Sequence, residues 1–580
     1  MMREATKIFK NSYYDTKNSR MHLWEQINGK DLYATYDWSP YVFLKNTKGH
    51  IRTIDGQSVH KKSFQTYQDY YNFSKDNSNI LENSIKPEIQ FLSERYYNIS
   101  DDELNVPNLL IYTIDIEVVR KKGFPNVNEA IDPINLISIK NSKTNKITTF
   151  GKKEYTGKKK ITYIHCEKEK ILLIKFFDFM YKNPPDVITG WNISNFDLPY
   201  IINRTKNLFG KDEIYRSLSP IKIVRTWQSK KYDEINIDIA GICILDYYQI
   251  YKWYSPNKLE SYTLDYVSKY ELEKGKLDYS EYKDLHDLYK NNWNLFVDYN
   301  VVDCDRVDSL EKKMGYIKLI QSLSLLTKCP MKFYNSMTQL IEGAMLTYFR
   351  RNNLCAPYFA GGTQEGFEAA YVKNPMKGMH EWVSSLDIRS SYPFHIITLN
   401  MSNETFIGCI NSLTEDEIIY NTKNRSFPKF TMIKNDVGVV EFNDKKLKSF
   451  NMALDRGLIT IAPCGSVFST TEPGVLAIVE REIYFKRKEV KGKMFEVKKN
   501  DPDNPKVGQL FALQLSIKIL LNAMFGITAV PYSRYFNTYI AEAITSCGRH
   551  TLKQGEKFVN SLLNDPTKKL KEIFKKIENE

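Results

Sequence analysis

The chain has 580 residues, with 82 Lys or Arg and 69 Asp or Glu, so its formal net charge at neutral pH is +13. This length exceeds what one hydrophobic core organises and predicts three or four domains, and a content of 42% hydrophobic and 13% aromatic residues excludes a mainly disordered chain. The positive charge favours a polyanionic partner without identifying it.

The eight cysteines lie far apart in the sequence, and none of them forms a C-x-x-C pair. This excludes zinc ribbons and thioredoxin-like redox sites. The spacing does not fit a disulfide framework either, so we expect a reducing, intracellular compartment. The first residues lack the apolar segment of a signal peptide. There is also no run of about 18 apolar residues, so we expect no membrane-spanning segment.

The first part of the chain alternates between strand-like and helical patterns. Residues 1–105 combine short strands, such as 41–44, with charged helical stretches, such as 64–76, and predict a small α+β domain. Leu109–Val119 is a β-branched, buried strand that carries two acids. The strands expected after it cover residues 134–139, 186–190 and 235–245, and helical patterns cover 168–182 and 287–303. This alternation predicts an α/β domain, followed by a mostly helical connection to about residue 355.

The second part of the chain is mostly helical by its pattern. Trp382–Asp387 predicts a strand that ends in an acid and then turns. Two long helices are expected at 474–494 and 508–526, with a polar loop at 500–505. The segment 566–580 has a Lys-rich helical pattern with one apolar face, formed by Leu570, Ile573, Phe574 and Ile577.

Two acids stand at alternate positions of the Leu109–Val119 strand. Asp115 and Glu117 therefore leave the same face of the strand, and their apolar neighbours place them on a core element. Two carboxylates on one rigid strand suit Mg²⁺ or Mn²⁺, which take oxygen ligands. Taken alone, a D-x-E pair is more typical of ordinary surface acids on a half-exposed edge strand.

Two further acidic patterns follow in the same predicted domain. Asp197 comes after a strand and a Gly turn, and we expect it at the start of a helix. Tyr299 and Asp303 lie four residues apart on one face of a predicted helix. Taken alone, Asp303 is typical of a solvated helix acid and Tyr299 of a packing residue.

Together the four acids predict a two-metal site for the hydrolysis of phosphodiester bonds. Two divalent ions about 3.5–4 Å apart would stabilise the attacking and leaving oxygens. One ion would make a bound water nucleophilic, and Tyr299 would orient that water.

Three short motifs resemble the three exonuclease motifs of family B DNA polymerases, and the replicative polymerases of large tailed phages are the most similar members. The motifs are Asp115-x-Glu117, Asn192-x-x-x-Phe196-Asp197 and Tyr299-x-x-x-Asp303. Segments 190–210 and 259–270 extend the resemblance. It implies an RNase H-like domain with 3′→5′ proofreading exonuclease activity, in which the four acids bind metal and Tyr299 takes part in catalysis.

The stretch from Asp387 to Tyr392 resembles the first palm motif of the same family. The resemblance implies that Asp387 and the backbone carbonyl of Ile388 bind the catalytic metals, and that Ser390 and Ser391 contact the triphosphate. Tyr392 would lie under the sugar and exclude a 2′-hydroxyl, which implies deoxynucleotides. Ser391 stands where the family usually has an apolar residue, which puts packing under the sugar in doubt. Outside this context, such a pattern is typical of a turn.

The two long helices resemble the finger helices of the family. Arg487 and Lys491 point one way, and Lys518 and Asn522 share a face, with Phe525 one turn further on. Cations bind triphosphate oxygens, and a flat aromatic ring suits stacking on a nascent base pair. Phe525 replaces the Tyr of the family's K-x-x-x-N-x-x-Y-G motif. Outside this context, the basic face is typical of a solvated helix and Phe525 of a core residue.

The second palm motif of the family, Asp-Thr-Asp-Ser or a relative, does not occur in these 580 residues, and no thumb is recognised. Nucleotidyl transfer needs a second carboxylate beside Asp387 to hold two metals. We therefore expect the N-terminal subunit of a split polymerase, completed by a second polypeptide for which the segment 566–580 is a candidate docking element. The alternatives are a stand-alone 3′→5′ exonuclease with a DNA-binding polymerase remnant, a truncated inactive polymerase, and a non-enzymatic basic scaffold for nucleic acid.

The predicted architecture is α/β and α+β multidomain: an RNase H-like 3′→5′ exonuclease domain plus an incomplete polymerase palm and helical fingers. The expected domains are 1–105 (with 316–360 returning to it), 106–315 for the exonuclease, 361–470 for the first part of the palm, 471–530 for the fingers and 531–580 for the continuation of the palm. The expected ligands are two Mg²⁺ or Mn²⁺ ions per active site, primer–template DNA, single-stranded 3′ ends and dNTPs. A sliding clamp is a candidate partner, and the host-cell cytoplasm is the expected location.

Overall fold

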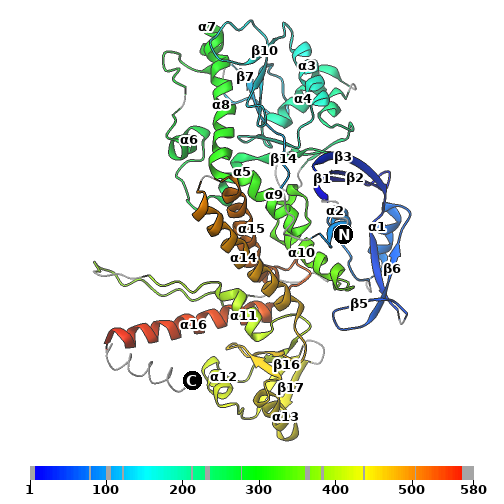
Figure 1. Cartoon of the computed structure of the whole chain (residues 1–580), viewed down its shortest axis with the longest axis vertical. Helices are drawn as coiled ribbons and strands as arrows, with labels where there is room; N and C mark the ends of the chain where they lie inside the picture. Colours follow the sequence, from blue (N-terminus) through cyan, green and yellow to red (C-terminus); the bar gives the residue numbers. More distant parts are fainter. Residues whose placement is uncertain are drawn as a thin grey trace. The chain divides into compact units, whose positions relative to one another are not determined.

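The computed structural model describes residues 7–564, except 47, 78–79, 100–105, 121–122, 211–212, 229–234, 276, 359–365, 381–384, 435–437 and 503. Contacts within the chain divide it into two compact units. The first unit comprises residues 1–41, 63–75 and 85–344, and the second comprises 42–62, 76–84 and 345–580 (Figure 1).

The first unit begins with an antiparallel meander and continues as an α/β domain. Its elements are β1 (Lys7–Asp15), β2 (Arg20–Ile27), β3 (Lys30–Asp37), α1 (Tyr67–Asp76), α2 (Pro87–Tyr96), β7 (Ile111–Val118), β8 (Ile134–Asn141), β9 (Ile147–Gly151), β10 (Thr162–His165), α3 (Glu169–Lys182), β11 (Val187–Gly190), α4 (Asp197–Phe209), η2 (Ile214–Leu218), β12 (Val224–Gln228), β13 (Ile235–Ile239), β14 (Cys243–Asp246), α5 (Tyr247–Tyr254), α6 (Leu264–Leu272), α7 (Leu285–Asn291), α8 (Trp293–Met314), α9 (Tyr316–Thr327) and η3 (Met331–Phe333). Helix α10 (Met337–Arg351) carries the chain into the second unit.

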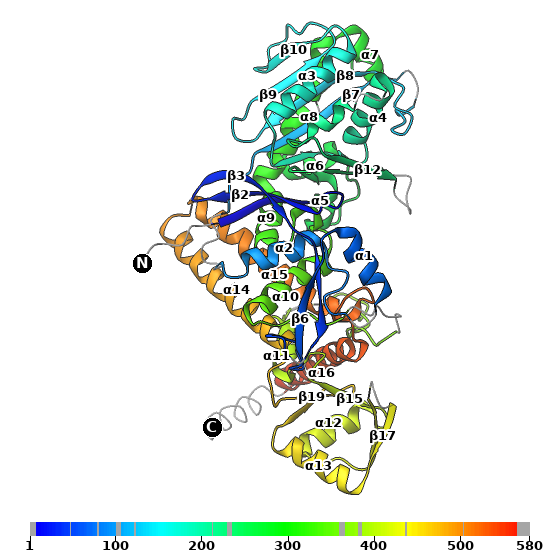
Figure 2. The same cartoon turned by 90° about the vertical axis from the view of Figure 1, so that its right-hand side faces the viewer.

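A six-stranded mixed sheet forms the centre of the α/β part of the first unit. Its strand order is β10-β9-β8-β7-β11-β14, and the first four of these strands are labelled in Figure 2. Strand β7 pairs antiparallel with β8 and parallel with β11, and β11 pairs parallel with β14. Strand β7 therefore lies inside the sheet, with both backbone edges paired, and holds its side chains rigidly.

The two faces of β7 have different neighbours. Ile114 and Ile116 belong to a buried apolar cluster with Phe176 of α3 and Leu198 of α4. The alternate positions face the other way, where Asn300 of α8 contacts Asp115. The period-2 alternation of the strand thus separates an apolar core face from an acidic face beneath α8.

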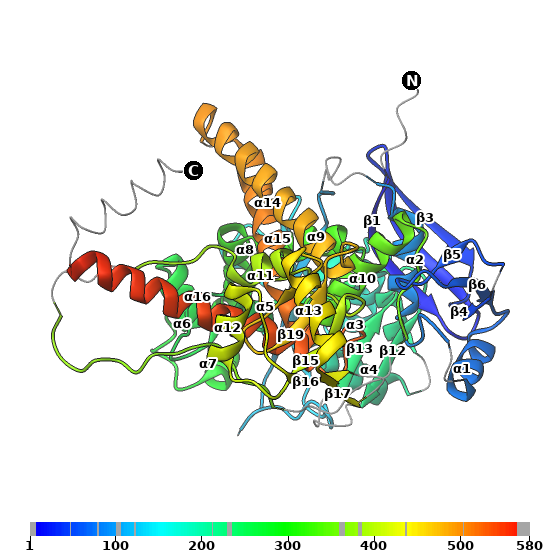
Figure 3. The ribbon, with the colours of Figure 1, turned by 90° about the horizontal axis from the view of Figure 1, so that it is seen from below.

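The second unit combines two small sheets with long helices. Its elements are β4 (Tyr41–Lys45), β5 (Ile51–Arg52), β6 (Ser58–Ser63), α11 (Ser391–Leu399), β15 (Phe406–Ile410), α12 (Glu415–Asn424), β16 (Phe430–Lys434), β17 (Gly438–Phe442), α13 (Asp444–Asp455), β18 (Ile459–Ile461), β19 (Ser466–Ser469), α14 (Val475–Asn500), α15 (Pro505–Ala529) and α16 (Thr538–Asn564). Strands β15–β19 form an antiparallel sheet of order β17-β16-β15-β19-β18, which lies with α12 and α13 (yellow in Figure 3).

Most of the predicted elements are present within a few residues of the expected bounds. The predicted strand at 109–119 is β7, and the two long helices are α14 and α15, which lie side by side and are joined by a short connection. The single helix expected at 287–303 is instead two helices, α7 and α8, because the Asn292 side chain caps α8 by accepting a hydrogen bond from the Leu295 amide at 3.0 Å.

The strand expected at Trp382–Asp387 is not present in its described part. Ser385–Asp387 form irregular, exposed chain, and residues 382–384 lie outside the described residues. A strand requires a neighbour to pair its backbone groups, and no described strand pairs with this segment. The helix expected at 566–580 also lies outside the described residues.

The expectations of no disulfide bonds and no membrane-spanning segment can be compared with the fold. All eight cysteines are described and free of disulfide bonds. Within the described residues, one helical segment, Lys506–Ala529 of α15, is long and apolar enough by composition to cross a membrane, and 44% of its most apolar window is buried inside the protein. A buried core helix has the same composition, so this segment is weak support for a membrane span.

Candidate exonuclease and nucleotidyl-transfer sites

The acids of β7 form the floor of the first site. Glu117 is buried, whereas Asp115 keeps part of its surface exposed. The pKa of the Asp115 carboxyl is raised well above its usual range. The largest cause is the loss of contact with water, and the negative charges of Asp197, Glu117 and Asp303 add to it. The four predicted acids, which come from three elements, are therefore close enough together to act on one another electrostatically.

Asp197 is fixed at the first turn of α4. Its Oδ1 accepts a hydrogen bond from the backbone amide of Ile116 on β7 at 3.0 Å, which joins the helix start to the acidic strand. Burial and the nearby charge of Asp246 raise the pKa of Asp197 to about 7, although the hydrogen bond from Ile116 partly offsets them. The predicted position of Asp197 at a helix start is confirmed.

Helix α8 brings Tyr299 and Asp303 to the acidic face. The Tyr299 ring packs edge-on against Tyr279, with ring centroids 5.5 Å apart. Burial and the charges of Asp303, Glu117 and Asp115 raise the pKa of the Tyr299 hydroxyl far above its usual value. The hydroxyl is therefore kept protonated and able to donate a hydrogen bond.

The residues of this cluster suit a hard divalent cation by their chemistry. All four side chains offer carboxylate oxygens, which are the ligands that such ions prefer, and the charges of the other three acids contribute to the raised pKa of Asp115. The fully buried Asn300 adds an amide oxygen, Oδ1, that has no hydrogen-bond partner. Among the described residues, no three His, Cys, Asp or Glu side chains lie close enough together to coordinate one metal ion.

Asn300 is a residue that the sequence motifs did not single out. Its Nδ2 donates a hydrogen bond to Oδ2 of Asp115 at 2.5 Å. This bond crosses from α8 to β7, and it favours the ionised form of Asp115. The only sequence signal was its position next to Tyr299, because the pairing with Asp115 spans almost the whole domain.

A second unpredicted residue, Asp246, shapes the loop before Asp197. Its carboxylate accepts hydrogen bonds from the backbone amides of Asn192 at 3.1 Å and Ser194 at 3.0 Å. Asn192 itself has a left-handed backbone (φ 66°), and its side-chain oxygen accepts a hydrogen bond from Nδ2 of Asn195 at 3.0 Å. The asparagines of the second motif thus build the turn that delivers Asp197.

The same loop borders an open cleft in the first unit. The cleft has a volume of about 520 Å³, and its lining includes Trp191, Asn192, Tyr248, Lys252, Tyr262 and Thr263. The ammonium group of Lys252 lies 5.0 Å from the ring centroid of Tyr248 and 5.5 Å from that of Tyr262. Aromatic faces beside a cation are the groups that bind single-stranded nucleic acid without reading its sequence.

Phe124 lies seven residues beyond Glu117 and is 94% exposed. Single exposed apolar side chains are ordinary in folded proteins, so the exposure of Phe124 shows only that its ring is accessible to a ligand. The backbone carbonyl of Phe124 accepts a hydrogen bond from Nη1 of Arg120 at 3.0 Å, which holds the loop that carries the ring.

In the second unit, the structure brings two of the predicted nucleotide-binding residues together. The Tyr392 ring on α11 lies 4.9 Å from the Phe525 ring on α15, centroid to centroid. Gly548 of α16 lies against Tyr392 as well, since a Cβ at that position would lie 3.0 Å from the ring. Tyr392 therefore packs against both α15 and α16.

The remaining predicted residues of the second unit are more exposed. Asp387 and Ile388 lie in irregular, exposed chain, and Ser390 has a left-handed backbone (φ 53°) directly before α11. Oγ of Ser391 lies 2.9 Å from Nε2 of His395, one turn further along α11. The polar stretch at the start of α11 is therefore held by the helix itself.

The basic side chains of the fingers project from α14 and α15. Lys491, Lys518 and Asn522 are exposed, and Arg487 is half-buried. Nε of Arg487 is buried without a hydrogen-bond partner. An unsatisfied guanidinium nitrogen beside exposed cations suits an anionic ligand.

Comparison with known proteins identifies the class. Residues 59–267 match the exonuclease domain of DNA polymerase family B, and residues 328–579 match DNA polymerase family B. The chain therefore belongs to the family B DNA polymerases, and the predicted fold class and family resemblance are confirmed.

Among its relatives are two phage enzymes and a eukaryotic one. The chain is 26% identical to the DNA-directed DNA polymerase of Escherichia phage RB69, over 93% of this chain and 65% of the relative. It is 26% identical to that of Enterobacteria phage T4, over 70% of this chain and 47% of the relative. It is 28% identical to the DNA polymerase delta catalytic subunit of Caenorhabditis elegans, over 67% of this chain and 33% of the relative. The chain thus spans less than two thirds of the length of these relatives.

Proposed function

We propose that the first unit is a 3′→5′ exonuclease that removes nucleotides from single-stranded DNA ends. The observation that carries the proposal is the convergence of Asp115, Glu117, Asp197 and Asp303, seen in the effect of the other three charges on the pKa of Asp115. Perturbed, mutually repelling carboxylates are typical of functional sites. Membership of the family supports the same reading.

The four acids would hold two divalent ions, Mg²⁺ or Mn²⁺, which when bound stabilise charge on the attacking and leaving oxygens. Tyr299 keeps its proton and orients the attacking water by donating a hydrogen bond to it. The water oxygen forms a bond to phosphorus, and the bond to the 3′ oxygen of the preceding nucleotide breaks. The products are a 5′-mononucleotide and a strand shortened by one residue.

The cleft and Phe124 would bind the strand end. The rings of Trp191, Tyr248 and Tyr262 offer stacking surfaces, and Lys252 offers a charge for the phosphate backbone. Because this binding neutralises phosphates, it should weaken as salt rises.

The test is degradation of a labelled single-stranded oligonucleotide by the full chain. Asp115→Asn with Glu117→Gln should abolish metal-dependent release of mononucleotides. The matched control is Asp416→Asn with Glu441→Gln, two exposed acids of the second unit, which should leave degradation unchanged. Persistence of full activity in the first variant would mean that the site is elsewhere.

We also propose that the second unit holds the nucleotide-binding half of a DNA-synthesis centre. Asp387 and Ile388 would bind metal, and Ser390, Ser391 and Tyr392 would bind the incoming dNTP. The finger residues assigned to the same dNTP are Arg487, Lys491, Lys518, Asn522 and Phe525. The packing of Tyr392 on Phe525 supports this assignment, because sugar exclusion requires a fixed ring.

Template-directed synthesis on primer–template DNA would then require the second acidic palm motif, which is not among these 580 residues. We propose that a second polypeptide supplies this motif and the thumb, with a sliding clamp as a further candidate partner in the host cytoplasm. Primer extension with the 580-residue chain alone should be negligible. It should appear when a polypeptide bearing the motif and thumb is added, and robust extension without it would refute the split arrangement.

A further inference from the structure

Arg306 is a buried cation on the same helix as the acid Asp303. Its side chain is 4% exposed, and it lies about one turn beyond Asp303 on α8. None of the sequence motifs includes it. A guanidinium group stays charged at all working pH values, so its burial requires fixed partners.

Three partners surround the guanidinium group. Nη1 donates a hydrogen bond to Oδ1 of Asp303 at 3.2 Å. Nη2 lies 3.8 Å from Oδ1 of Asp265 on α6, and it donates a hydrogen bond to the backbone carbonyl of Gly275, which follows α6. The planar fork of Arg is thus used on two sides, which a Lys ammonium group cannot reproduce.

Asp265 connects this contact to the cleft. It follows Thr263 and Leu264, both of which line the cleft, and Thr263 caps α6 by accepting a hydrogen bond from the Tyr266 amide. The wall of the cleft and the acid Asp303 are therefore joined by one guanidinium group. This contact couples the position of Asp303 to that of the segment that lines the cleft.

We propose that Arg306 is a positioning residue of the exonuclease site, which holds Asp303 in place for a divalent ion and ties it to the wall of the nucleotide cleft. This inference rests on the proposed exonuclease function. By donating a hydrogen bond to Oδ1 of Asp303, Arg306 restricts the orientation of the carboxylate that would bind the ion. Outer contacts of this kind set the orientation of metal ligands, and their loss lowers metal affinity or activity roughly 10- to 100-fold.

The test compares variants of the full chain by two readouts. The first is the shift in the thermal unfolding temperature that Mg²⁺ or Mn²⁺ alone produces. The second is the kinetics of degradation of a single-stranded oligonucleotide, measured as the metal concentration that gives half-maximal activity and as the KM for the oligonucleotide. Arg306→Lys keeps the charge but loses the fork, and Arg306→Met loses both. Both variants should need roughly 10- to 100-fold more metal for the same unfolding shift and for half-maximal activity.

Asp265→Ala separates the two parts of the proposal. It leaves the contact between Arg306 and Asp303 intact and removes only the tie to the cleft wall. We expect a higher KM for the oligonucleotide with an unchanged metal requirement. A raised metal requirement in this variant would overturn the assignment of Asp265 to the cleft side.

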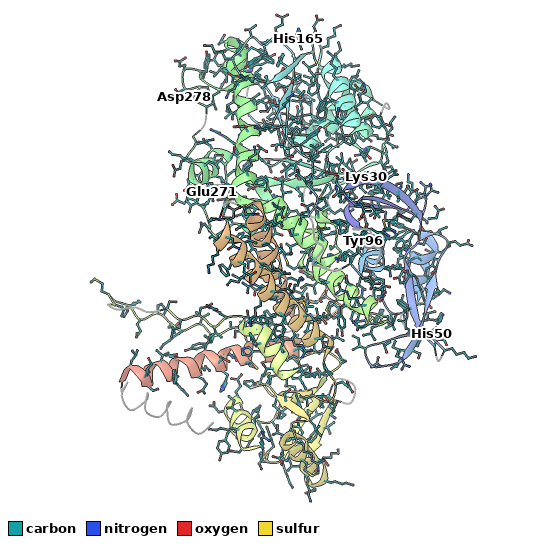
Figure 4. The ribbon with its side chains drawn as sticks, viewed as in Figure 1. Lys30, His50, Tyr96, His165, Glu271 and Asp278 are labelled. Carbon is teal, nitrogen blue, oxygen red and sulfur yellow. The ribbon has the colours of Figure 1, made fainter. Side chains whose placement is uncertain are left out.

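The matched control is Lys313→Met. Lys313 also lies on α8, and its Nζ lies 3.1 Å from Oε2 of Glu271, which belongs to α6 and is labelled in Figure 4. This pair joins the same two helices without contacting Asp303, so its loss should change neither readout. If the Arg306 variants behave like Lys313→Met, the proposal is wrong, and Arg306 only holds helices together.

The outcome is distinct from that of the exonuclease proposal. Degradation by the unaltered chain, lost in Asp115→Asn with Glu117→Gln, establishes the exonuclease whatever Arg306 does. Should the unaltered chain not degrade DNA, the metal-induced unfolding shift still decides whether Arg306 positions Asp303. If Arg306→Met does not fold, Arg306→Lys still tests the proposal, because it keeps the positive charge and a similar side-chain volume.

Discussion

Replacing Asp197 with Asn should stabilise the metal-free protein while it destroys exonuclease activity. The carboxyl of Asp197 is buried, and its pKa is raised to about 7. The native state therefore resists its ionisation. The amide side chain introduced by Asp197→Asn keeps an oxygen that accepts the hydrogen bond from the Ile116 amide, so the substitution removes the charge with little loss of structure.

The magnitude follows from the two pKa values. The reference value is 3.8 and the folded value is about 7, and this difference corresponds to roughly 4 kcal/mol at about 1.36 kcal/mol per pH unit. Because the folded state retains the proton that the unfolded state loses above pH 4, stability falls as pH rises from about 4 to 7. At pH 8 the full cost applies, so Asp197→Asn should gain up to about 4 kcal/mol there.

The assay is chemical unfolding in chelator at pH 5 and pH 8, followed by tryptophan fluorescence. This signal reports mainly on the first unit, which contains every tryptophan except Trp382. The variant should already exceed the unaltered chain by roughly 1.6 kcal/mol at pH 5, and by roughly 4 kcal/mol at pH 8. It should lose this advantage when Mg²⁺ is added, because the ion stabilises only the chain with all four acids. Equal stability of the two proteins at pH 8 in chelator would refute the buried-charge reasoning.

Asn300→Leu should lower kcat for degradation roughly 10- to 100-fold, because Asp115 loses its hydrogen-bond donor. Asn294→Leu, at a half-buried position of the same helix whose side chain bonds Thr156 instead of the acids, should not lower kcat, and equal rates for the two variants would contradict the role of Asn300. If the Phe124 ring stacks on a base, Phe124→Ala should raise KM for single-stranded DNA roughly tenfold without a change in kcat. Phe124→Trp keeps an aromatic ring and should keep the affinity. An unchanged KM in the alanine variant would show that the ring does not stack on a base. Tyr392→Ala in the assembled polymerase should admit ribonucleotides, as primer extension with rNTPs measures, and intact sugar discrimination would remove its assigned role.

Much of the first unit could be predicted because its local patterns are strong. Strand β7 is β-branched and alternates in burial, and α8 and α4 begin where polar turn residues end. Strands β15–β19 were not predicted individually, because each has at most five residues and their stability comes from pairing with one another. The expected strand at Trp382–Asp387 was wrong in its described part, since strand propensity alone does not supply a partner.

The residues of the candidate site also fall into two groups, those that the sequence predicted and those that it did not. The acids were found because their spacing on a strand or helix is local, whereas Asn300 and Asp246 act across long sequence separations. Asp115 and Asn300 are 185 positions apart in the sequence, and nothing in the sequence between them signals that the two will meet. The domain limits inferred from the sequence stay predictions, as do the roles assigned to individual residues.

The alternation of the chain between its two units affects how the protein can be dissected. The first unit is complete only when residue 344 has been made, because residues 1–41 belong with 85–344. Within it, Lys10 of β1 forms an ion pair with Asp186 at 2.6 Å, and Asn11 donates a hydrogen bond to the Gly241 carbonyl at 3.0 Å. A truncation that begins at residue 85 would leave Asp186 and the Gly241 carbonyl without these contacts. Because each unit is built from separate stretches of the chain, no single proteolytic cut would release either unit whole. On the ribosome, Asn11 can make its hydrogen bond to Gly241 only after the 230 residues up to that glycine have been added.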